Sequence, residues 1–364
     1  KGASQILANC FLLLSVISVV ITALSLLMKN KLLVWFGAST SIFPYADDYI
    51  TIYLLGTIFA LLSIGMNQFI ICQGFAKVAM KSVVLGAVVN IALDPVFIFA
   101  CGMGVRGGAL ATVLSQMASA GYVLLFLFGK KVPVPITFGG YQWRIMKRVI
   151  LLGLSPFLII AFDNVLIIAM NASLQHFGGA EGDMLLTCNT IVQSFMLMVT
   201  MPLGGITGGT QTILGYNFGA RRSDRVLAAQ QYIVILSMAF TAVMFVIAQT
   251  VPHYFVQIFT RDPEYVELTV RAIRIFTLGI IPLAAQYEIV DGYTGMGIAP
   301  IAISLSTVRK TLYLLGVVLI PMFFSVEAVF YTEPISDFLG TAVSITMYLM
   351  TMKKILRRRE NGEM

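Results

Sequence analysis

The stretch VVLGAVVNIALDPVFIFACG, residues 83–102, decides the fold class, because it is apolar and long enough to cross a membrane yet carries an amide and a carboxylate in its middle. Asn90 and Asp94 are four residues apart, so they lie on one face of a helix. A carboxylate near the centre of a bilayer costs roughly 2.5 to 3.5 kcal/mol. It is kept where a bundle interior or a water-filled cavity receives it, so this pair predicts a functional site, with a structural polar contact between helices as the alternative.

The composition of the whole chain agrees with a membrane protein. Of its 364 residues, 58% are hydrophobic and only 11% are charged, and the mean hydropathy of +0.90 exceeds that of ordinary soluble proteins. We therefore predict an all-α integral membrane protein. The net charge of +7 comes from Lys and Arg in short loops, which is a topology signal, so no nucleic-acid partner is expected. The four cysteines and two histidines show no metal-ligand spacing, and we predict no cofactor and no metal beyond a possible Na+.

Windows of roughly 20 apolar residues predict about ten membrane-spanning helices. Alternate loops carry the positive charge, so these loops and both chain termini are expected on the cytoplasmic side of a plasma (inner) membrane. The predicted spans cover residues 8–28, 50–71, 82–101, 106–129, 149–170, 185–208, 229–251, 269–290, 300–323 and 335–352.

The chain resembles itself at a constant offset of 223 residues. Gly56 corresponds to Gly279 and Gly74 to Gly297, and the register holds without a gap as far as Lys131. A constant register over this length predicts two structural repeats. About six spans separate the copies, and this even number makes the repeats parallel, related by an axis along the membrane normal.

The repeat predicts two lobes of six helices each. The first lobe shows four in this sequence, so about ten of an expected twelve spans are present, and we expect the other two before the first residue. Two lobes built from parallel repeats are typical of alternating-access transporters. The predicted organisation is an N-lobe over 1–131, an inter-lobe linker rich in Pro and Gly over 132–146, a C-lobe over 147–354 and a cytoplasmic tail over 355–364.

Three motifs resemble the multidrug and toxic-compound extrusion (MATE) family of transporters, and the resemblance covers the whole chain. They are NxxxDP at residues 90–95, VRGGALAT at 105–112 and GYNFGARR at 215–222. MATE proteins are similar in having twelve helices in two lobes, so the two expected helices would be the family's first pair. The resemblance implies a transporter and not an enzyme, present as a monomer in the lipid bilayer.

In the N-lobe, the resemblance implies a site for the coupling ion, which is a proton or Na+. Either ion neutralises a buried carboxylate, and amide and hydroxyl oxygens can replace water around Na+. At the repeat offset Asp94 becomes Val317 and Thr112 becomes Ile335. The fold therefore does not require polar groups at these positions, which favours a functional role. The residues that match the family's ion site are Asp94, Asn90, Thr112, Asn67 and Tyr49.

The C-lobe has acidic residues of its own in apolar surroundings. In other branches of the family, acids on these two helices are linked to cation or substrate binding; Asp163 matches that position better than Glu288, and Glu288 and Asp291 could instead face water at a helix end. Arg309 and Lys310 lie inside a predicted span, where snorkelling or an internal ion pair is expected. The C-lobe candidates are Asp163, Asn164, Glu288 and Asp291.

Three methionines in QSFMLMVTMPLGG, residues 193–205, are candidates for lining a pliable hydrophobic cavity that accepts varied ligands. Packing in the core or against lipid is the alternative. The residues are Met196, Met198 and Met201.

Together these features predict a secondary active exporter that moves small, amphipathic and often cationic organic compounds outward in exchange for H+ or Na+. Asp94 is the predicted coupling residue, and its neutralisation would shift the balance between outward-open and inward-open states. A lipid-linked oligosaccharide flippase of the same superfamily would line its cavity with Arg and Lys. An intramembrane enzyme would need His, Ser/Lys or paired Asp groups on facing helices. The mostly acidic intramembrane charge disfavours the first alternative, and the confinement of both histidines to loops disfavours the second.

Overall fold

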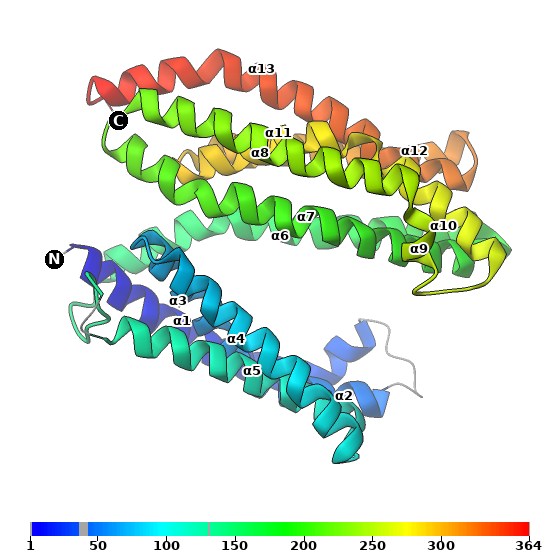
Figure 1. Ribbon diagram of the computed structural model, residues 1–364, viewed down its shortest axis with the longest axis horizontal. Helices are drawn as coiled ribbons and strands as arrows, with labels where there is room; N and C mark the ends of the chain where they lie inside the picture. Colours follow the sequence, from blue (N-terminus) through cyan, green and yellow to red (C-terminus); the bar gives the residue numbers. More distant parts are fainter. Residues whose placement is uncertain (1, 36–42, 130–131, 364) are drawn as a thin grey trace. The chain divides into compact units, whose positions relative to one another are not determined.

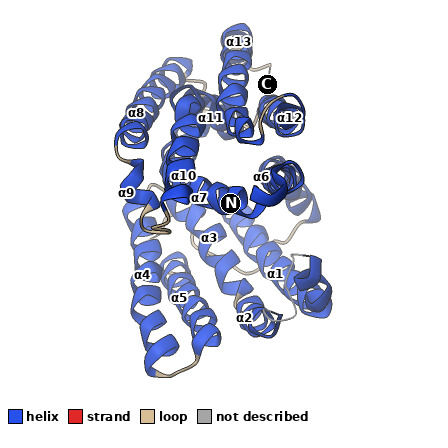
Figure 2. Ribbon diagram, turned by 90° about the vertical axis from the view of Figure 1, so that its right-hand side faces the viewer, coloured by secondary structure: helices blue, strands red, loops and turns tan. Residues whose placement is uncertain are grey.

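Helices form nearly all of the computed structural model, which describes residues 2–35, 43–129 and 132–363, and no strand occurs within these ranges (Figure 2). The chain divides into two units, Lys1–Ile150 (unit 1) and Leu151–Met364 (unit 2). The lobe boundary predicted at residue 131 falls outside the described residues.

Helix α5 makes the most extensive contacts in unit 1, where it packs against α2, α3 and α4. The face of α5 that contacts these neighbours carries small residues such as Ala109, Ala111 and Ser115, all buried, and small side chains let helix backbones approach closely in a membrane. Unit 1 comprises α1 (Gly2–Trp35), α2 (Phe43–Leu55), α3 (Thr57–Cys72), α4 (Ala76–Pro95), the π-helical turn η1 (Val96–Ala100) and α5 (Gly104–Leu127) (Figure 1).

In unit 2 the central helix is α11, which packs against α7, α8, α12 and α13. A buried cluster that includes Phe195, Phe276 and Phe330 fills one part of this unit, and a second cluster around Tyr293 and Leu305 fills another. The first helix of unit 2, α6, begins in the last residues of unit 1. The elements are α6 (Trp143–Gly178), η2 (Gly179–Glu181), α7 (Gly182–Gly219), α8 (Ser223–Thr250), α9 (Pro252–Val256), α10 (Pro263–Phe276), η3 (Thr277–Gly279), α11 (Ile280–Gly295), α12 (Ala299–Phe323), η4 (Val326–Tyr331) and α13 (Thr332–Glu360).

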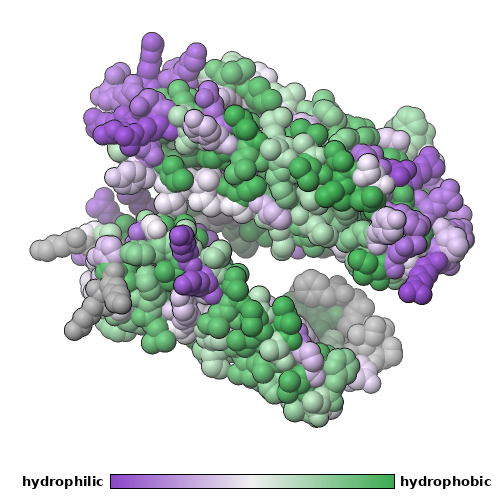
Figure 3. All heavy atoms as spheres, viewed as in Figure 1, coloured by the Kyte–Doolittle hydropathy of each residue, from purple (hydrophilic) through white to green (hydrophobic). Residues whose placement is uncertain are grey.

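The number and place of the predicted spans are confirmed. Within the described residues, nine helical segments are long and apolar enough to cross a membrane, and α2 with α3, which meet at a bend of 49°, can form a tenth. In unit 2, hydrophobic side chains cover the middle of the helices and hydrophilic ones gather at both ends (Figure 3). This distribution matches a bilayer core with water on either side.

Backbone features support the repeat. A Cβ at Gly56 would lie 2.5 Å from Val113 Cγ2, and a Cβ at Gly279 would lie 2.7 Å from the Cβ of Asp337, so both glycines allow a close helix contact at the junction between two helices. Gly74 and Gly297 both have a positive φ, +88° and +78°, in the turn that follows. These equivalent positions therefore have the same backbone requirement in both copies.

The part of the predicted linker that the structure describes is fixed to unit 1. Gln73 receives a hydrogen bond from the Val134 amide at 2.9 Å and donates one to the carbonyl oxygen of Val134 at 3.2 Å. Asn9 accepts from the Gln142 amide at 2.8 Å and donates to the Gly140 carbonyl oxygen at 3.2 Å. Helix α6 then begins at Trp143, inside the range 132–146.

The VRGGALAT motif owes its first glycine to the π-helical turn beside it. Pro95 has no amide hydrogen to donate within α4, and the wider turn η1 follows it directly. The backbone of η1 presses on α5 at Gly107, where a Cβ would lie 2.7 Å from the carbonyl carbon and oxygen of Phe97. Only glycine leaves enough room for this contact.

Replacing Gly107 with Ala should lower the free energy of unfolding by about 1 to 3 kcal/mol, because the backbone of η1 would have to shift. Gly108 provides a matched control, since a Cβ there meets only the Ile98 side chain, at 3.6 Å from Cδ1 and 4.0 Å from Cγ1, which are ordinary contacts. Gly108→Ala should be neutral or slightly stabilising. Unfolding of the intact protein in mixed micelles measures both, and equal losses for the two variants would contradict this packing.

Candidate functional site

A cavity of about 360 Å³ lies among α6, α7, α11 and α12 of unit 2. Its size is that of a small-molecule binding site. Its walls combine apolar side chains with four charged groups, which is the composition expected for an amphipathic ligand. The lining residues are Pro156, Ile159, Ile160, Asp163, Gln211, Gln286, Tyr287, Val290, Asp291, Thr294, Ser306, Arg309 and Lys310.

Two adjacent residues of α12 supply the basic groups and reach different partners. Successive residues of an α-helix point about 100° apart. Lys310 therefore turns towards α6, where its Nζ lies 2.7 Å from Asp163 Oδ1 and also donates to the carbonyl oxygen of Ile159. The Lys310 side chain is 3% exposed and the Asp163 side chain 48%.

Arg309 turns towards α13 instead. Its Nη1 lies 2.9 Å from Asp337 Oδ1 and 3.4 Å from Glu333 Oε1; the Asp337 side chain is fully buried, and those of Arg309 and Glu333 are 12% and 13% exposed. Gly340 makes room for the stem of the arginine, because a Cβ there would lie 2.8 Å from Arg309 Cβ. Both positive charges of the cavity are thus compensated by carboxylates, as an apolar environment requires.

Asp291 is the second carboxylate of the cavity wall, and two residues of α7 donate hydrogen bonds to it. Its side chain accepts hydrogen bonds from Thr207 Oγ1 at 2.5 Å and from Gln211 Nε2 at 3.0 Å. Glu288, one turn earlier on α11, does not line the cavity. It is buried beside Gly292, close to Gln230 of α8. The two acids therefore lie in different surroundings.

Unit 1 has a cavity at the equivalent place of the repeat. It measures about 460 Å³ and lies among α3, α4 and α5. Seven of its lining positions correspond at the offset of 223 to lining positions of the unit 2 cavity, but the charges differ: Gln68 stands where unit 2 has Asp291, and Gly86 and Ala87 stand where unit 2 has Arg309 and Lys310. The seven positions are Ser63, Ile64, Asn67, Gln68, Val83, Gly86 and Ala87.

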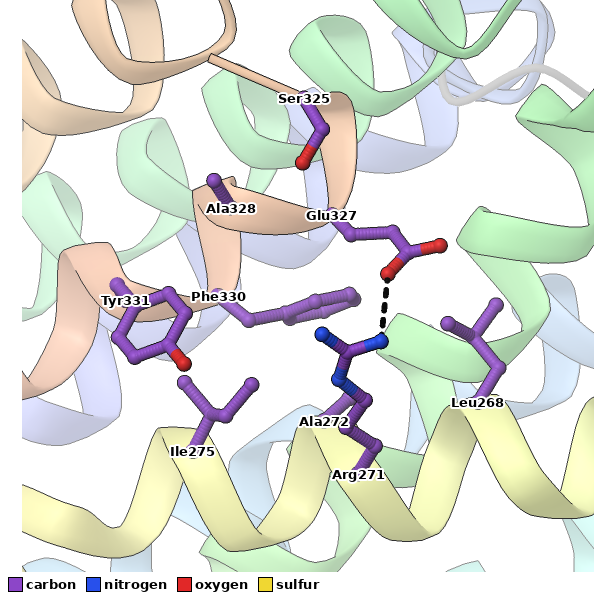
Figure 4. A pocket seen from close by; sticks show the side chains of 9 residues that line it. All are labelled: Leu268, Arg271, Ala272, Ile275, Ser325, Glu327, Ala328, Phe330 and Tyr331. Atoms are coloured by element: carbon purple, nitrogen blue, oxygen red, sulfur yellow. Dashed lines mark hydrogen bonds and ion pairs between the residues drawn. The ribbon is translucent and has the colours of Figure 1, made fainter.

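A smaller space of about 70 Å³ lies between α10 and η4, near the ends of these helices (Figure 4). Here Arg271 Nη1 approaches Glu327 Oε2 at 3.4 Å, and the two side chains are 70% and 42% exposed. This is a solvated surface ion pair, unlike the buried contacts of Arg309.

Comparison with known proteins decides the family. The family model MatE matches residues 1–96 and 160–322, more than half of the chain. The chain belongs to the MATE family. It is 26% identical over 345 residues to Protein DETOXIFICATION 43 of Arabidopsis thaliana, a match that covers 93% of this chain and 61% of that protein. It is 25% identical over 262 residues to the Multidrug export protein MepA of Staphylococcus haemolyticus, with 70% of this chain and 55% of that protein covered.

The fold agrees with solved MATE structures. The structure described as the outward-facing conformation of a multidrug resistance MATE family transporter of the MOP superfamily superposes with a TM-score of 0.91 at 20% identity, covering 97% of this chain and 80% of that one. The chain thus spans most of a solved MATE structure but only about 55 to 61% of the two curated relatives.

The predicted ion-coupling residues of this MATE chain lie on four helices of unit 1. Asp94 and Asn90 occupy successive turns of α4, next to Pro95. Asp94 is half-buried, and among the described residues it has no ion pair and no hydrogen bond to the other four candidates. The Nδ2 atom of Asn90 is buried without a hydrogen-bond partner in the described structure.

The other three N-lobe candidates are engaged elsewhere. Asn67 lines the unit 1 cavity and accepts a hydrogen bond from Ser82 at 3.2 Å. Thr112 donates to the carbonyl oxygen of Gly108 on its own helix, α5. Tyr49 is exposed and stacks on Tyr53. The five residues therefore share the unit but do not form one hydrogen-bonded network.

Among the C-lobe candidates of the MATE chain, only Asp163 and Asp291 line the cavity. Asn164 is exposed and bonds back to the carbonyl oxygen of Ile160. The methionines do not share one face of α7: Met196 is buried in the core, whereas Met198 and Met201 are exposed, and none of the three lines the unit 2 cavity.

Sequence reasoning missed the partners of the cavity charges. Glu333 and Asp337 were not identified, although an arginine inside a span requires acidic partners and these two acids are four residues apart at the start of α13. Thr207 and Gln211 gave no signal, because an isolated threonine or glutamine in an apolar helix is common. The internal ion pairs expected for Arg309 and Lys310 are confirmed.

Proposed function

We propose that this MATE protein is a secondary active exporter that moves amphipathic, often cationic organic compounds out of the cell in exchange for H+ or Na+. It acts in the plasma (inner) membrane as a monomer, with both termini cytoplasmic, and it needs no cofactor. The relatives named for multidrug export and the MATE structure in an outward-facing conformation support transport by alternating access.

The unit 2 cavity is the observation that carries this proposal. Asp163 and Asp291 place two carboxylates among apolar side chains such as Ile159, Ile160 and Val290. An organic cation gains from this combination, because its charge meets a carboxylate while its hydrocarbon part leaves water. A neutral compound gains only the second contribution.

Asp94 is proposed as the coupling group in unit 1. Among the described residues it has no basic partner, so a proton or Na+ can neutralise it, whereas a permanent ion pair would prevent this. Neutralisation removes a charge from an apolar span, and the two protonation or ion-bound states then favour different packing of α4. The coupling step and cation binding are thus assigned to different units.

A flippase for lipid-linked oligosaccharides is not favoured. Such a protein needs free basic groups to hold a pyrophosphate, but Arg309 and Lys310 are both paired with carboxylates.

Transport by the intact protein in proteoliposomes tests the proposal. With a tenfold H+ or Na+ gradient, we expect uphill movement of the lipophilic cation tetraphenylphosphonium with at least one of the two ions. A tenfold gradient is worth about 1.4 kcal/mol, so one-for-one exchange supports at most about a tenfold gradient of the organic cation. Absence of uphill movement with both ions, or movement that persists when both gradients are collapsed, would overturn the proposal.

A further inference from the structure

The contact between Lys310 and Asp163 is asymmetric. The ammonium is nearly inaccessible, with the lysine side chain 3% exposed, while the aspartate side chain is 48% exposed and lines the cavity. The lysine Nζ lies 2.7 Å from Oδ1 of the aspartate. The carboxylate is therefore shared between a buried internal cation and the open space in which an organic cation would bind.

We propose that Lys310 is a built-in competitor for the cationic ligand. Its ammonium neutralises Asp163 when the cavity holds no organic cation, and it gives up the carboxylate when the positive group of a ligand arrives. This inference rests on the proposed function, and it makes Lys310 a residue that sets affinity and selectivity for charge.

The surroundings of Lys310 allow this exchange. Its Nζ also donates to the carbonyl oxygen of Ile159, so the ammonium keeps a hydrogen-bond acceptor after Asp163 turns to a ligand. Arg309 cannot take the same role, because it pairs with two carboxylates of α13 that do not line the cavity. Of the two cavity cations, only Lys310 pairs with a carboxylate that is itself part of the cavity wall.

The internal repeat has a neutral residue at the position equivalent to Lys310. The equivalent position in unit 1 is Ala87, which lines the equivalent cavity without any charge. Helix α4 thus packs in unit 1 without a charge at this place, so the lysine is a feature of unit 2 and not of the repeat.

The competition predicts how affinity depends on ligand charge. A cationic ligand must displace the Lys310 ammonium from Asp163, so its binding free energy is reduced by part of the energy of this ion pair. A neutral ligand leaves the ion pair intact. The pair is half-exposed, so its value lies between that of a surface ion pair and that of a buried one. Removing the competitor should tighten binding of cations by about tenfold and leave neutral ligands unaffected.

Equilibrium binding of tetraphenylphosphonium to the purified intact protein tests this proposal, with neutral Nile red as the uncharged probe. Lys310→Met should lower the Kd for tetraphenylphosphonium about tenfold and leave that for Nile red unchanged. Lys310→Arg, which keeps the ion pair, should bind like the parent. Lys354→Met, at an exposed position of α13, is the control for loss of a lysine and should also bind like the parent.

The double variant Asp163→Asn with Lys310→Met separates competition from a general change of the cavity. The double variant should not bind tetraphenylphosphonium more tightly than Asp163→Asn alone, because it lacks the carboxylate that Lys310 and the ligand compete for. Unchanged or weaker tetraphenylphosphonium binding by Lys310→Met, or tightening that persists in the double variant, would overturn the proposal. If Lys310→Met does not purify as a monodisperse protein, Lys310→Gln takes its place with the same expected tightening.

Binding in detergent needs no ion gradient, so the two proposals fail separately. Normal gradient-driven transport with unchanged affinity in Lys310→Met would reject the competitor alone. If the parent protein shows no ion-driven transport but Lys310→Met binds the cation more tightly, the proposed function alone is rejected.

Discussion

Replacing Asp94 with Asn is expected to abolish uphill export of tetraphenylphosphonium while the protein remains folded. The amide is neutral whether or not an ion is present, so binding H+ or Na+ no longer changes the charge inside α4. The steady-state gradient of the organic cation should fall from as much as about tenfold, with a tenfold ion gradient and one-for-one exchange, to about onefold. Proteoliposomes containing the intact protein measure both values.

Asp224→Asn is the matched control for this variant, because it makes the same chemical change at an exposed position at the start of α8. It should keep the gradient of the parent. Binding of tetraphenylphosphonium to Asp94→Asn should also be retained, since the cavity of unit 2 is unchanged. A full gradient in Asp94→Asn would remove this residue from the coupling mechanism.

Replacing Arg309 with Met is expected to cause the largest loss of stability. The change leaves Asp337, whose side chain is 0% exposed, and Glu333, whose side chain is 13% exposed, without their positive partner. Removing one member of a buried ion pair costs about 3 to 5 kcal/mol, because the remaining charge stays in an apolar environment. The free energy of unfolding in mixed micelles should fall by this amount.

Arg271→Met is the control with a similar ion pair on the surface. Arg271 and Glu327 approach at 3.4 Å, the distance between Arg309 and Glu333, but they are largely exposed (Figure 4). Surface pairs contribute about 0 to 1 kcal/mol, so this variant should be nearly neutral. Adding Glu333→Gln and Asp337→Asn to Arg309→Met should restore most of the lost stability, and a failure to do so would show that packing of the arginine stem dominates.

Hydropathy and the internal repeat predicted the membrane-spanning helices, because both can be read from the sequence without knowledge of tertiary contacts. A span must be apolar over its whole length, so each predicted span corresponds to a helical segment of the structure. The repeat also paired Gly56 with Gly279, and at both positions a side chain would collide with the neighbouring helix. Close helix contacts of this kind select glycine and are visible in the sequence.

The site could be predicted only in part, because the sequence does not show which face of each helix lines the cavity. Asp163 and Asp291 were identified as acids in apolar segments, and the structure shows that both line one cavity. Glu288 looked equivalent to Asp291, but it is buried beside Gly292 and does not line the cavity. The partners Glu333 and Asp337 come from another helix, and pairing them with Arg309 requires tertiary contacts.

Ion counterflow tests the central claim, cation-coupled antiport, most directly. Proteoliposomes containing the intact protein are prepared without any ion gradient, and a tetraphenylphosphonium gradient is then imposed while a lumenal pH dye and radioactive Na+ report the two ions. Antiport predicts that the organic cation drives H+ or Na+ in the opposite direction, and that Asp94→Asn abolishes this flux. Tetraphenylphosphonium movement unaccompanied by counterflow of either ion would contradict the account.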